Sequence, residues 1–202
     1  MSKLRLGIYG GTFSPPHLGH VRAATTFVRE AKLDRLLIMP DFLPPHKENF
    51  GRVSAEDRLE MCRLAFADVP HSEVSDYEVC KGGRSYTYLT LENFSAEDVD
   101  LYFLCGTDML LTLDTWKNPE SIFKLATICY VRRERDESTD MLVDAKVREL
   151  VKRFQARIFE LKHDVFEVSS TGIRTDISEH TKANDTLPRA VVEYINKRGL
   201  YQ

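Results

Sequence analysis

The residues most able to do chemistry form one segment near the N-terminus, Gly10-Gly11-Thr12-Phe13-Ser14-Pro15-Pro16-His17-Leu18-Gly19-His20. Two adjacent glycines let a ligand approach the backbone without a Cβ atom in the way. His17 and His20 are three residues apart, so they share a face of a first helical turn. A helix start adds unpaired N–H groups and a partial positive charge. The segment therefore predicts an anion site, and the residues expected to surround the anion are Gly10, Gly11, Thr12, Phe13, His17 and His20.

Three other interpretations of this segment are open. Histidines at this spacing could both coordinate zinc, although no third or fourth ligand is near them in the sequence and a helix start favours anions. A structural glycine turn with two solvated histidines is the second. A dinucleotide-binding loop of an oxidoreductase is the third, and it is the weakest because Gly10-Gly11 is not followed by the G-x-G-x-x-G spacing.

Two further segments could contact phosphates. Ser170-Thr171 precedes Ile173-Arg174 at a second predicted helix start. Hydroxyls, N–H groups and the forked donors of a guanidinium suit a phosphate there. Lys47 lies in the proline-rich segment 40–53, which is long enough to suggest more than a connection. A lysine there could close over a phosphate, although most surface lysines have no such role.

Three positions could contact the rest of a nucleotide. Asp108 follows Gly106 after an apolar run, where its carboxylate could accept from a ribose hydroxyl, hold a metal-bound water or belong to a plain turn. Thr87 stands at a helix start and could bind a ligand or act as an ordinary N-cap. Trp116, the only tryptophan, could anchor the core or form a platform for a flat aromatic ligand.

Alternating strands and helices are predicted to position these residues. Apolar runs bounded by turn residues predict strands over 4–9, 34–39, 74–79, 100–105, 127–131 and 157–161. Helical periodicity predicts helices over 18–31, from the cap Ser54 onward, and over 86–94, 119–125, 141–154 and 187–198. This order predicts an α/β fold, a Rossmann-like doubly wound and mostly parallel sheet with helices on both faces.

In such a sheet, ligands bind beyond the carboxyl ends of the strands. The loops after Tyr9, Met39 and Cys105 each follow a strand and should therefore lie on this one edge. Arg133 follows the strand 127–131 and could face the same edge, but the neighbouring Arg132 leaves the register open.

The composition is that of a globular protein, and a single domain over 1–202 is expected for 202 residues. A net charge of −3 argues against a nucleic-acid partner. No apolar stretch reaches membrane-spanning length, and the N-terminus has no signal-peptide pattern. The four cysteines form no C-x-x-C pair and are interpreted as small, mostly buried hydrophobes, which fits a reducing, cytoplasmic compartment. A homo-oligomer is neither indicated nor excluded.

The N-terminal segment resembles the H-x-G-H signature of a nucleotidyltransferase superfamily. From Leu4 to Tyr201 the chain is similar to the bacterial nicotinate-nucleotide adenylyltransferases. An ordered set of segments carries this similarity: Pro44-Pro45-His46-Lys47, Ser85-Tyr86-Thr87, Gly106-Thr107-Asp108-Met109-Leu110, Trp116, Ser169-Ser170-Thr171-Gly172-Ile173-Arg174, and Leu187-Pro188 through Gly199-Leu200-Tyr201. The family pattern S-Y-T-x-D-T-L has Leu89 at its Asp position here.

The resemblance implies transfer of the adenylyl group of ATP to nicotinate mononucleotide, with deamido-NAD and pyrophosphate as products, in NAD biosynthesis. It implies that Mg²⁺ enters with ATP, that Trp116 stacks on the pyridine ring, and that His17, His20, Lys47 and Arg174 are catalytic. The implied ATP-binding residues are Gly10, Gly11, Thr12, Phe13, His17, His20, Ser170, Thr171, Ile173 and Arg174, and the implied mononucleotide-binding residues are Lys47, Thr87, Gly106, Asp108, Trp116 and Arg133. A transferase for pantetheine phosphate, glycerol phosphate or nicotinamide mononucleotide is the nearest alternative, and a non-catalytic nucleotide sensor is the alternative from another class.

Overall fold

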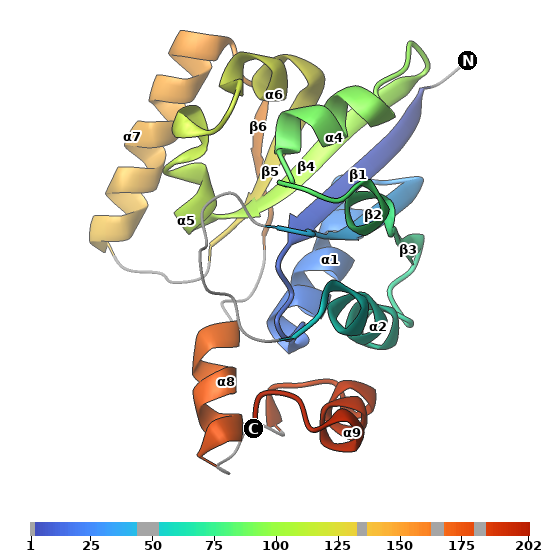
Figure 1. Ribbon diagram of the computed structural model, residues 1–202. Helices are drawn as coiled ribbons and strands as arrows, with labels where there is room; N and C mark the ends of the chain where they lie inside the picture. The colour runs from blue at the N-terminus through green and yellow to red at the C-terminus, as the bar shows by residue number, and fades with distance from the viewer. Residues whose placement is uncertain (1–2, 44–52, 133–136, 163–167, 180–184) are drawn as a thin grey trace.

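A computed structural model describes residues 3–43, 53–132, 137–162, 168–179 and 185–202 of the chain. Its strands form one sheet in the order β3-β2-β1-β4-β5-β6, and every neighbouring pair is parallel (Figure 1). The strands are β1 Leu4–Gly11, β2 Arg35–Pro40, β3 Ser72–Val74, β4 Val99–Gly106, β5 Ala126–Val131 and β6 Ile158–Glu160. The predicted Rossmann-like, doubly wound sheet is confirmed.

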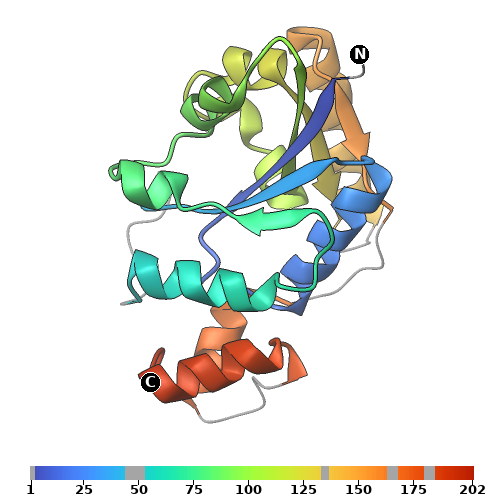
Figure 2. The same ribbon diagram turned by 90° about the vertical axis from the view of Figure 1, so that its right-hand side faces the viewer.

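Helices cover both faces of this sheet, as Figure 2 shows from the side. They are α1 Leu18–Glu30, α2 Ala55–Ala65, α3 Tyr77–Lys81, α4 Thr87–Phe94, α5 Thr107–Leu110, α6 Pro119–Leu125, α7 Glu137–Phe154, α8 Ser170–Ser178 and α9 Arg189–Arg198, with a 3₁₀ turn over Leu113–Thr115. Of the helices in the described part of the chain, none is long and apolar enough to cross a membrane.

Two hydrophobic cores result from the alternation of side chains along the strands. In β2, Leu36 and Ile38 pack in the core that includes residues of α1, α2, α8 and α9. Leu37 and Met39 face the opposite way and pack in the core that includes residues of α4, α5, α6 and α7. Each buried strand therefore reads as a continuous apolar run, which is why the central strands were predictable.

The clearest differences from the sequence prediction are at β3, at the end of β1 and at the start of α7, which begins at Glu137 rather than at 141. A strand over 74–79 is wrong, because β3 ends at Val74 and α3 begins at Tyr77. The polar pair Ser75-Asp76 turns the chain there: the Tyr77 N–H donates to Ser75 Oγ (3.3 Å), and the Cys80 N–H donates to the Asp76 carbonyl (2.8 Å). The first strand also does not end at Tyr9, since its two glycines remain in register with the end of β2.

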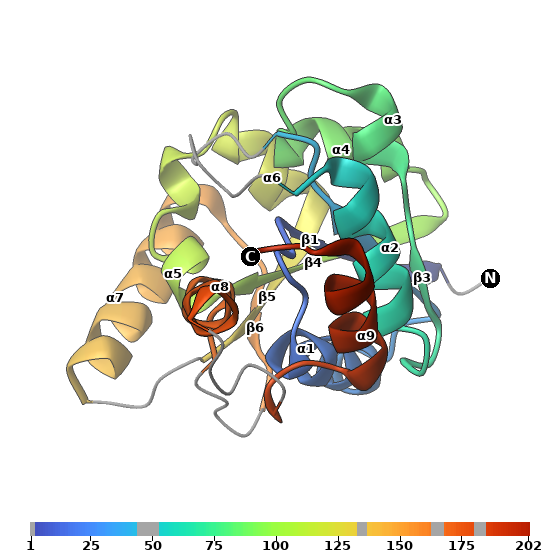
Figure 3. The ribbon, with the colours of Figure 1, turned by 60° about the horizontal axis from the view of Figure 1, so that its bottom comes forward.

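The sheet order changes direction at β1, which lies between β2 and β4. The crevice beyond the carboxyl ends of strands at such a switch point is where ligands bind in open α/β sheets. The C-terminal helices α8 and α9 lie at this end of the molecule, and the chain terminus lies between them (Figures 1 and 3). Residues more than 150 positions apart can therefore meet at the site (|i−j| = 155 for Ser170 and Pro15).

The cysteine interpretation is confirmed for three of the four thiols. Cys62, Cys105 and Cys129 are buried and free, whereas Cys80 is exposed. Burial raises the pKa of Cys129 to about 12, so this thiol stays protonated and unreactive at neutral pH.

Candidate active site

A cavity of about 480 Å³ opens at the carboxyl edge of the sheet. This volume is within the usual range for a small-molecule site. The loops that follow β1, β2 and β4 all contribute to its wall, as the sequence predicted, and the start of α8 closes one side. Most of the predicted site residues line it together: Gly10, Gly11, Thr12, Phe13, His17, His20, Thr87, Gly106, Asp108, Trp116, Ser170, Thr171 and Arg174.

The two histidines hold each other in a reciprocal capping box at the start of α1. His17 is the N-cap rather than a helical residue, and its Nδ1 accepts the His20 N–H (3.3 Å). The Nδ1 of His20 in turn accepts the His17 N–H (3.1 Å), and the rings stack with centroids 3.6 Å apart. Because both Nδ1 atoms are acceptors, each neutral ring carries its proton on Nε2. The box thus fixes both tautomers.

The loop before the histidines is shaped by an aromatic cluster. Phe13 has φ 46°, in the left-handed region, and its ring packs edge-on against Tyr9, His20 and Phe66 with centroids 5.3, 5.1 and 5.7 Å apart. A Cβ atom at Gly11 would lie 3.1 Å from the Phe13 ring, which explains the glycine. The Phe13 ring therefore contacts His20 in addition to its stacked partner His17.

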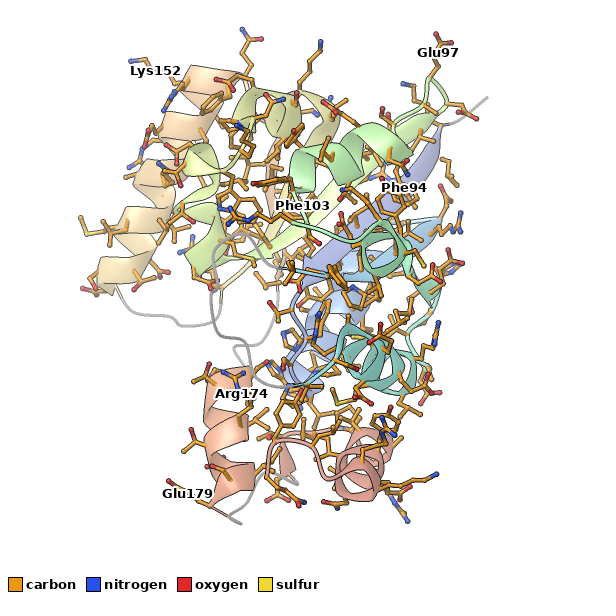
Figure 4. The ribbon with its side chains drawn as sticks, viewed as in Figure 1. Phe94, Glu97, Phe103, Lys152, Arg174 and Glu179 are labelled. Carbon is orange, nitrogen blue, oxygen red and sulfur yellow. The ribbon has the colours of Figure 1, made fainter. Side chains whose placement is uncertain are left out.

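The start of α8 is hydrogen-bonded to this loop. Arg174 donates from Nη1 to the Ser14 carbonyl (2.8 Å) and from Nη2 to Thr171 Oγ1 (3.1 Å). Ser170 Oγ donates to the Pro15 carbonyl (3.0 Å). Figure 4 shows Arg174 toward the end of α8 that faces the sheet and Glu179 at the far end. The two predicted phosphate segments thus form one surface, with two helix N-termini and a guanidinium beside it.

The opposite part of the wall is more apolar. Trp116 is half-buried and lies edge-on to Phe103, with ring centroids 6.3 Å apart and an interplanar angle of 76°. It packs on the core and also lines the cavity, so both sequence interpretations describe part of its environment. Thr87 is the first residue of α4, and its N-cap is Tyr86, so Thr87 is not the cap. Asp108 is exposed beside Gly106 in the first turn of α5.

Three other predicted or questioned positions are absent from the cavity wall. Lys47 and Arg133 fall outside the described residues. Ile173 does not line the cavity, because its side chain is buried in the core beneath α8. Arg132 is held by Glu160, Asp140 and Asp144 on the far strand edge, away from the cavity wall. Leu89 is also absent from the wall, so the departure from the family pattern does not alter the cavity lining.

Sequence reasoning missed a buried arginine that joins two walls of the site. Arg58 in α2 is fully buried, and its guanidinium donates to the Thr12 carbonyl (2.8 Å), to Asp41 Oδ1 (3.1 Å) and to the carbonyls of Asp41 (2.6 Å) and Phe42 (3.2 Å). Thr12 Oγ1 also donates to Asp41 Oδ2 (3.0 Å). This network fixes the loop after β1 to the loop after β2.

Two other side chains near the site were also missed. Tyr201 is within hydrogen-bond distance of Ser14 through its hydroxyl (3.0 Å), and burial raises its pKa. Glu78 is buried in α3 and lines the cavity. No local signal identifies either residue, although the ending Gly199-Leu200-Tyr201 was part of the family resemblance.

Comparison with known proteins agrees with this geometry. A family model described as cytidylyltransferase-like matches residues 8–176. A protein of Desulfatibacillum aliphaticivorans named "Probable nicotinate-nucleotide adenylyltransferase" is 36% identical over 215 residues, which span 98% of this chain and 100% of that protein. A protein of Clostridium acetobutylicum with the same name is 36% identical over 196 residues, spanning 96% and 97% of the two chains. The chain belongs to the nicotinate-nucleotide adenylyltransferase family.

A solved structure shares the fold of this family member. The nicotinic acid mononucleotide adenylyltransferase of Plasmodium falciparum, complexed with NaAD, superposes with a TM-score of 0.75 at 18% identity, covering 98% of this chain and 97% of that one. Among the described residues of this adenylyltransferase, no three His, Cys, Asp or Glu side chains are grouped to hold a metal ion.

Proposed function

We propose that this chain transfers the adenylyl group of ATP to nicotinate mononucleotide, forming deamido-NAD and pyrophosphate in NAD biosynthesis. The observation that carries the proposal is that one cavity has two chemically different ends. One end presents histidines, helix N-termini and an arginine, which suit phosphates. The other presents Trp116, Phe103 and a helix start at Thr87, which suit a flat ring with a polar substituent.

The reaction needs no nucleophile from the protein. A phosphate oxygen of the mononucleotide attacks the α-phosphorus of ATP, a P–O bond forms, and the bond from the α-phosphorus to the bridging oxygen breaks with its electron pair on pyrophosphate. The chain contributes position and charge stabilisation. The Nε2–H groups of His17 and His20 donate to phosphoryl oxygens, and the partial positive charge at the start of α1 stabilises the same anions.

Arg174 and the first turn of α8 are proposed to hold the pyrophosphate half. Arg174 already donates to the Ser14 carbonyl, so its guanidinium is oriented before ATP arrives. Lys47 and Arg133 remain predictions for phosphate contacts. Mg²⁺ is the proposed divalent ion, and when bound it would neutralise charge on the ATP phosphates while keeping several waters. Asp108 is the one predicted carboxylate in the wall that could hold such a water.

A substrate panel tests this function. Purified protein is incubated with ATP and Mg²⁺ together with nicotinate mononucleotide, nicotinamide mononucleotide, pantetheine phosphate or glycerol phosphate, and pyrophosphate release is followed. We expect the highest kcat/KM for nicotinate mononucleotide. A higher value for any other acceptor would reassign the substrate, and binding of ATP without pyrophosphate release from any of them would favour a nucleotide sensor.

A further inference from the structure

A buried carboxylate lies in the wall of the cavity and has no place in the mechanism above. Glu78 is 3% exposed and comes from α3, on the short connection between β3 and α4. Charged side chains are seldom this buried unless something compensates the loss of water. The question is what compensates Glu78.

The protein itself satisfies only part of this side chain. Oε1 accepts a hydrogen bond from the Thr90 hydroxyl in α4. Oε2 is buried and has no hydrogen-bond partner among the described residues. The Lys81 ammonium lies 3.7 Å from it as an ion pair, with its side chain 28% exposed. Among the described residues, the charge of this buried carboxylate in the cavity wall is therefore offset by one partly exposed ammonium that makes no hydrogen bond to it.

The position of Glu78 assigns it to the ring-binding end of the cavity. Thr90 lies one helical turn after Thr87, and both line the cavity. The neighbouring wall residues Leu91, Phe103 and Ile122 are apolar and buried. A charge acts over a longer range and with more energy in such surroundings than in water. The phosphate-binding histidines, in contrast, belong to the loop after β1.

We propose that the Glu78 carboxylate is the counter-charge for the pyridinium ring of the mononucleotide. The inference rests on the proposed function. A pyridine ring joined to ribose through its nitrogen carries a fixed positive charge, whichever acid or amide it bears. A buried carboxylate in the wall beside apolar residues stabilises that cation. Glu78 therefore contributes to the binding of both nicotinate and nicotinamide mononucleotides through the ring charge that they share.

Two substitutions separate this electrostatic role from a structural one. Glu78→Gln keeps an oxygen that can accept from Thr90 but removes the charge. Thr90→Val removes that hydrogen bond but keeps the charge. We expect Glu78→Gln to raise the calorimetric Kd and the KM for nicotinate mononucleotide about tenfold, with the KM for ATP changed less than about twofold. We expect Thr90→Val to change both mononucleotide constants less than about threefold.

A change in the ligand gives an independent test. The 1,4-dihydro form of nicotinamide mononucleotide has nearly the same size, differs by one hydrogen at C4 and has no ring charge. Wild-type protein should bind the oxidised form about tenfold more tightly than the dihydro form, and Glu78→Gln should remove most of this difference. Equal effects of Glu78→Gln and Thr90→Val, or the same oxidised-to-dihydro ratio in wild type and Glu78→Gln, would overturn the proposal.

The outcomes also separate this inference from the function on which it rests. Wild-type protein that binds and adenylylates nicotinate mononucleotide, together with a Glu78→Gln variant that binds it equally well, overturns only the role of Glu78. Wild-type protein that neither binds nor adenylylates any pyridine mononucleotide overturns the proposed function, and the role of Glu78 with it. Circular dichroism of each variant checks that the fold is retained.

Discussion

Substitution of His20 can separate its capping role from its proposed catalytic role, because the two roles use different ring atoms. Nδ1 accepts the His17 N–H (3.1 Å), and Nε2 carries the proton proposed to face a phosphate. Asparagine reproduces an acceptor near the Nδ1 position but has nothing at Nε2. Glutamine brings an amide N–H toward the Nε2 position, and at this third helical position its Oε1 can also accept the capping N–H.

The magnitudes follow from the two contacts. Loss of one donor to the charge of a transition state costs about 10²- to 10³-fold in kcat. Loss of an N-terminal capping contact costs about 0.5–2 kcal/mol of unfolding free energy. We therefore expect His20→Asn to lose about 10²- to 10³-fold in kcat at nearly wild-type stability. His20→Gln should retain more activity, also at nearly wild-type stability, because glutamine suits this position of a capping box.

Pyrophosphate release and urea unfolding measure the two quantities on the same preparations. His71→Asn is the matched control, because His71 is exposed, lies outside the cavity wall, and has φ 57°, which asparagine tolerates. It should change neither quantity. A His20→Asn variant with near-normal kcat would refute the assignment of Nε2 as the functional atom. A kcat for His20→Asn that is no lower than that of His20→Gln would refute it as well.

Three further substitutions test the supports of the site. Arg58→Met should lower the unfolding free energy, measured in urea, by about 3–5 kcal/mol, because it removes a buried cation that joins two loops. The control Arg63→Met, at an exposed position on the same helix, should lower it by less than about 0.5 kcal/mol. Similar losses for the two variants would contradict the network. Burial would raise the pKa of Asp57, but hydrogen bonds from Tyr194 and Ser54 and the charge of Arg198 bring it below 3.8. Its contribution to stability is then complete above about pH 4 and lost as the pH falls through the lowered pKa, so the Tm deficit of Asp57→Asn should close on acidification; a deficit independent of pH would refute this. Trp116→Ala should raise the KM for nicotinate mononucleotide about tenfold and leave the KM for ATP nearly unchanged, and equal effects would remove the stacking role.

The sequence predicted those parts of the fold and site that depend on neighbouring residues. The buried strands follow from continuous apolar runs, and the phosphate loop follows from two glycines, two prolines and a helix start. The shared cavity was predictable because parallel strands place their carboxyl ends on one edge. Strand β3 was predicted at the wrong residues because it is short, pairs on one side only and has no apolar run.

The missed residues depend on contacts between distant segments. An arginine on a helix is ordinarily exposed, and no local pattern shows that Arg58 reaches the Thr12 carbonyl 46 positions away. Glu78 is buried only because α4 packs over it, and its partner Thr90 lies in the next helix. The helix begins at Leu18 as predicted, but the capping box of His17 and His20 was missed because histidine is not a usual capping residue.

Isotope transfer tests the central claim most directly, because the claim is that the mononucleotide's own phosphate attacks the α-phosphorus of ATP. Nicotinate mononucleotide labelled with ¹⁸O at the three non-bridging phosphate oxygens is incubated with unlabelled ATP, Mg²⁺ and the protein, and both products are analysed by mass spectrometry. The account predicts deamido-NAD that carries all the label and pyrophosphate that carries none. Label in pyrophosphate, or turnover of ATP without a labelled dinucleotide, would contradict it.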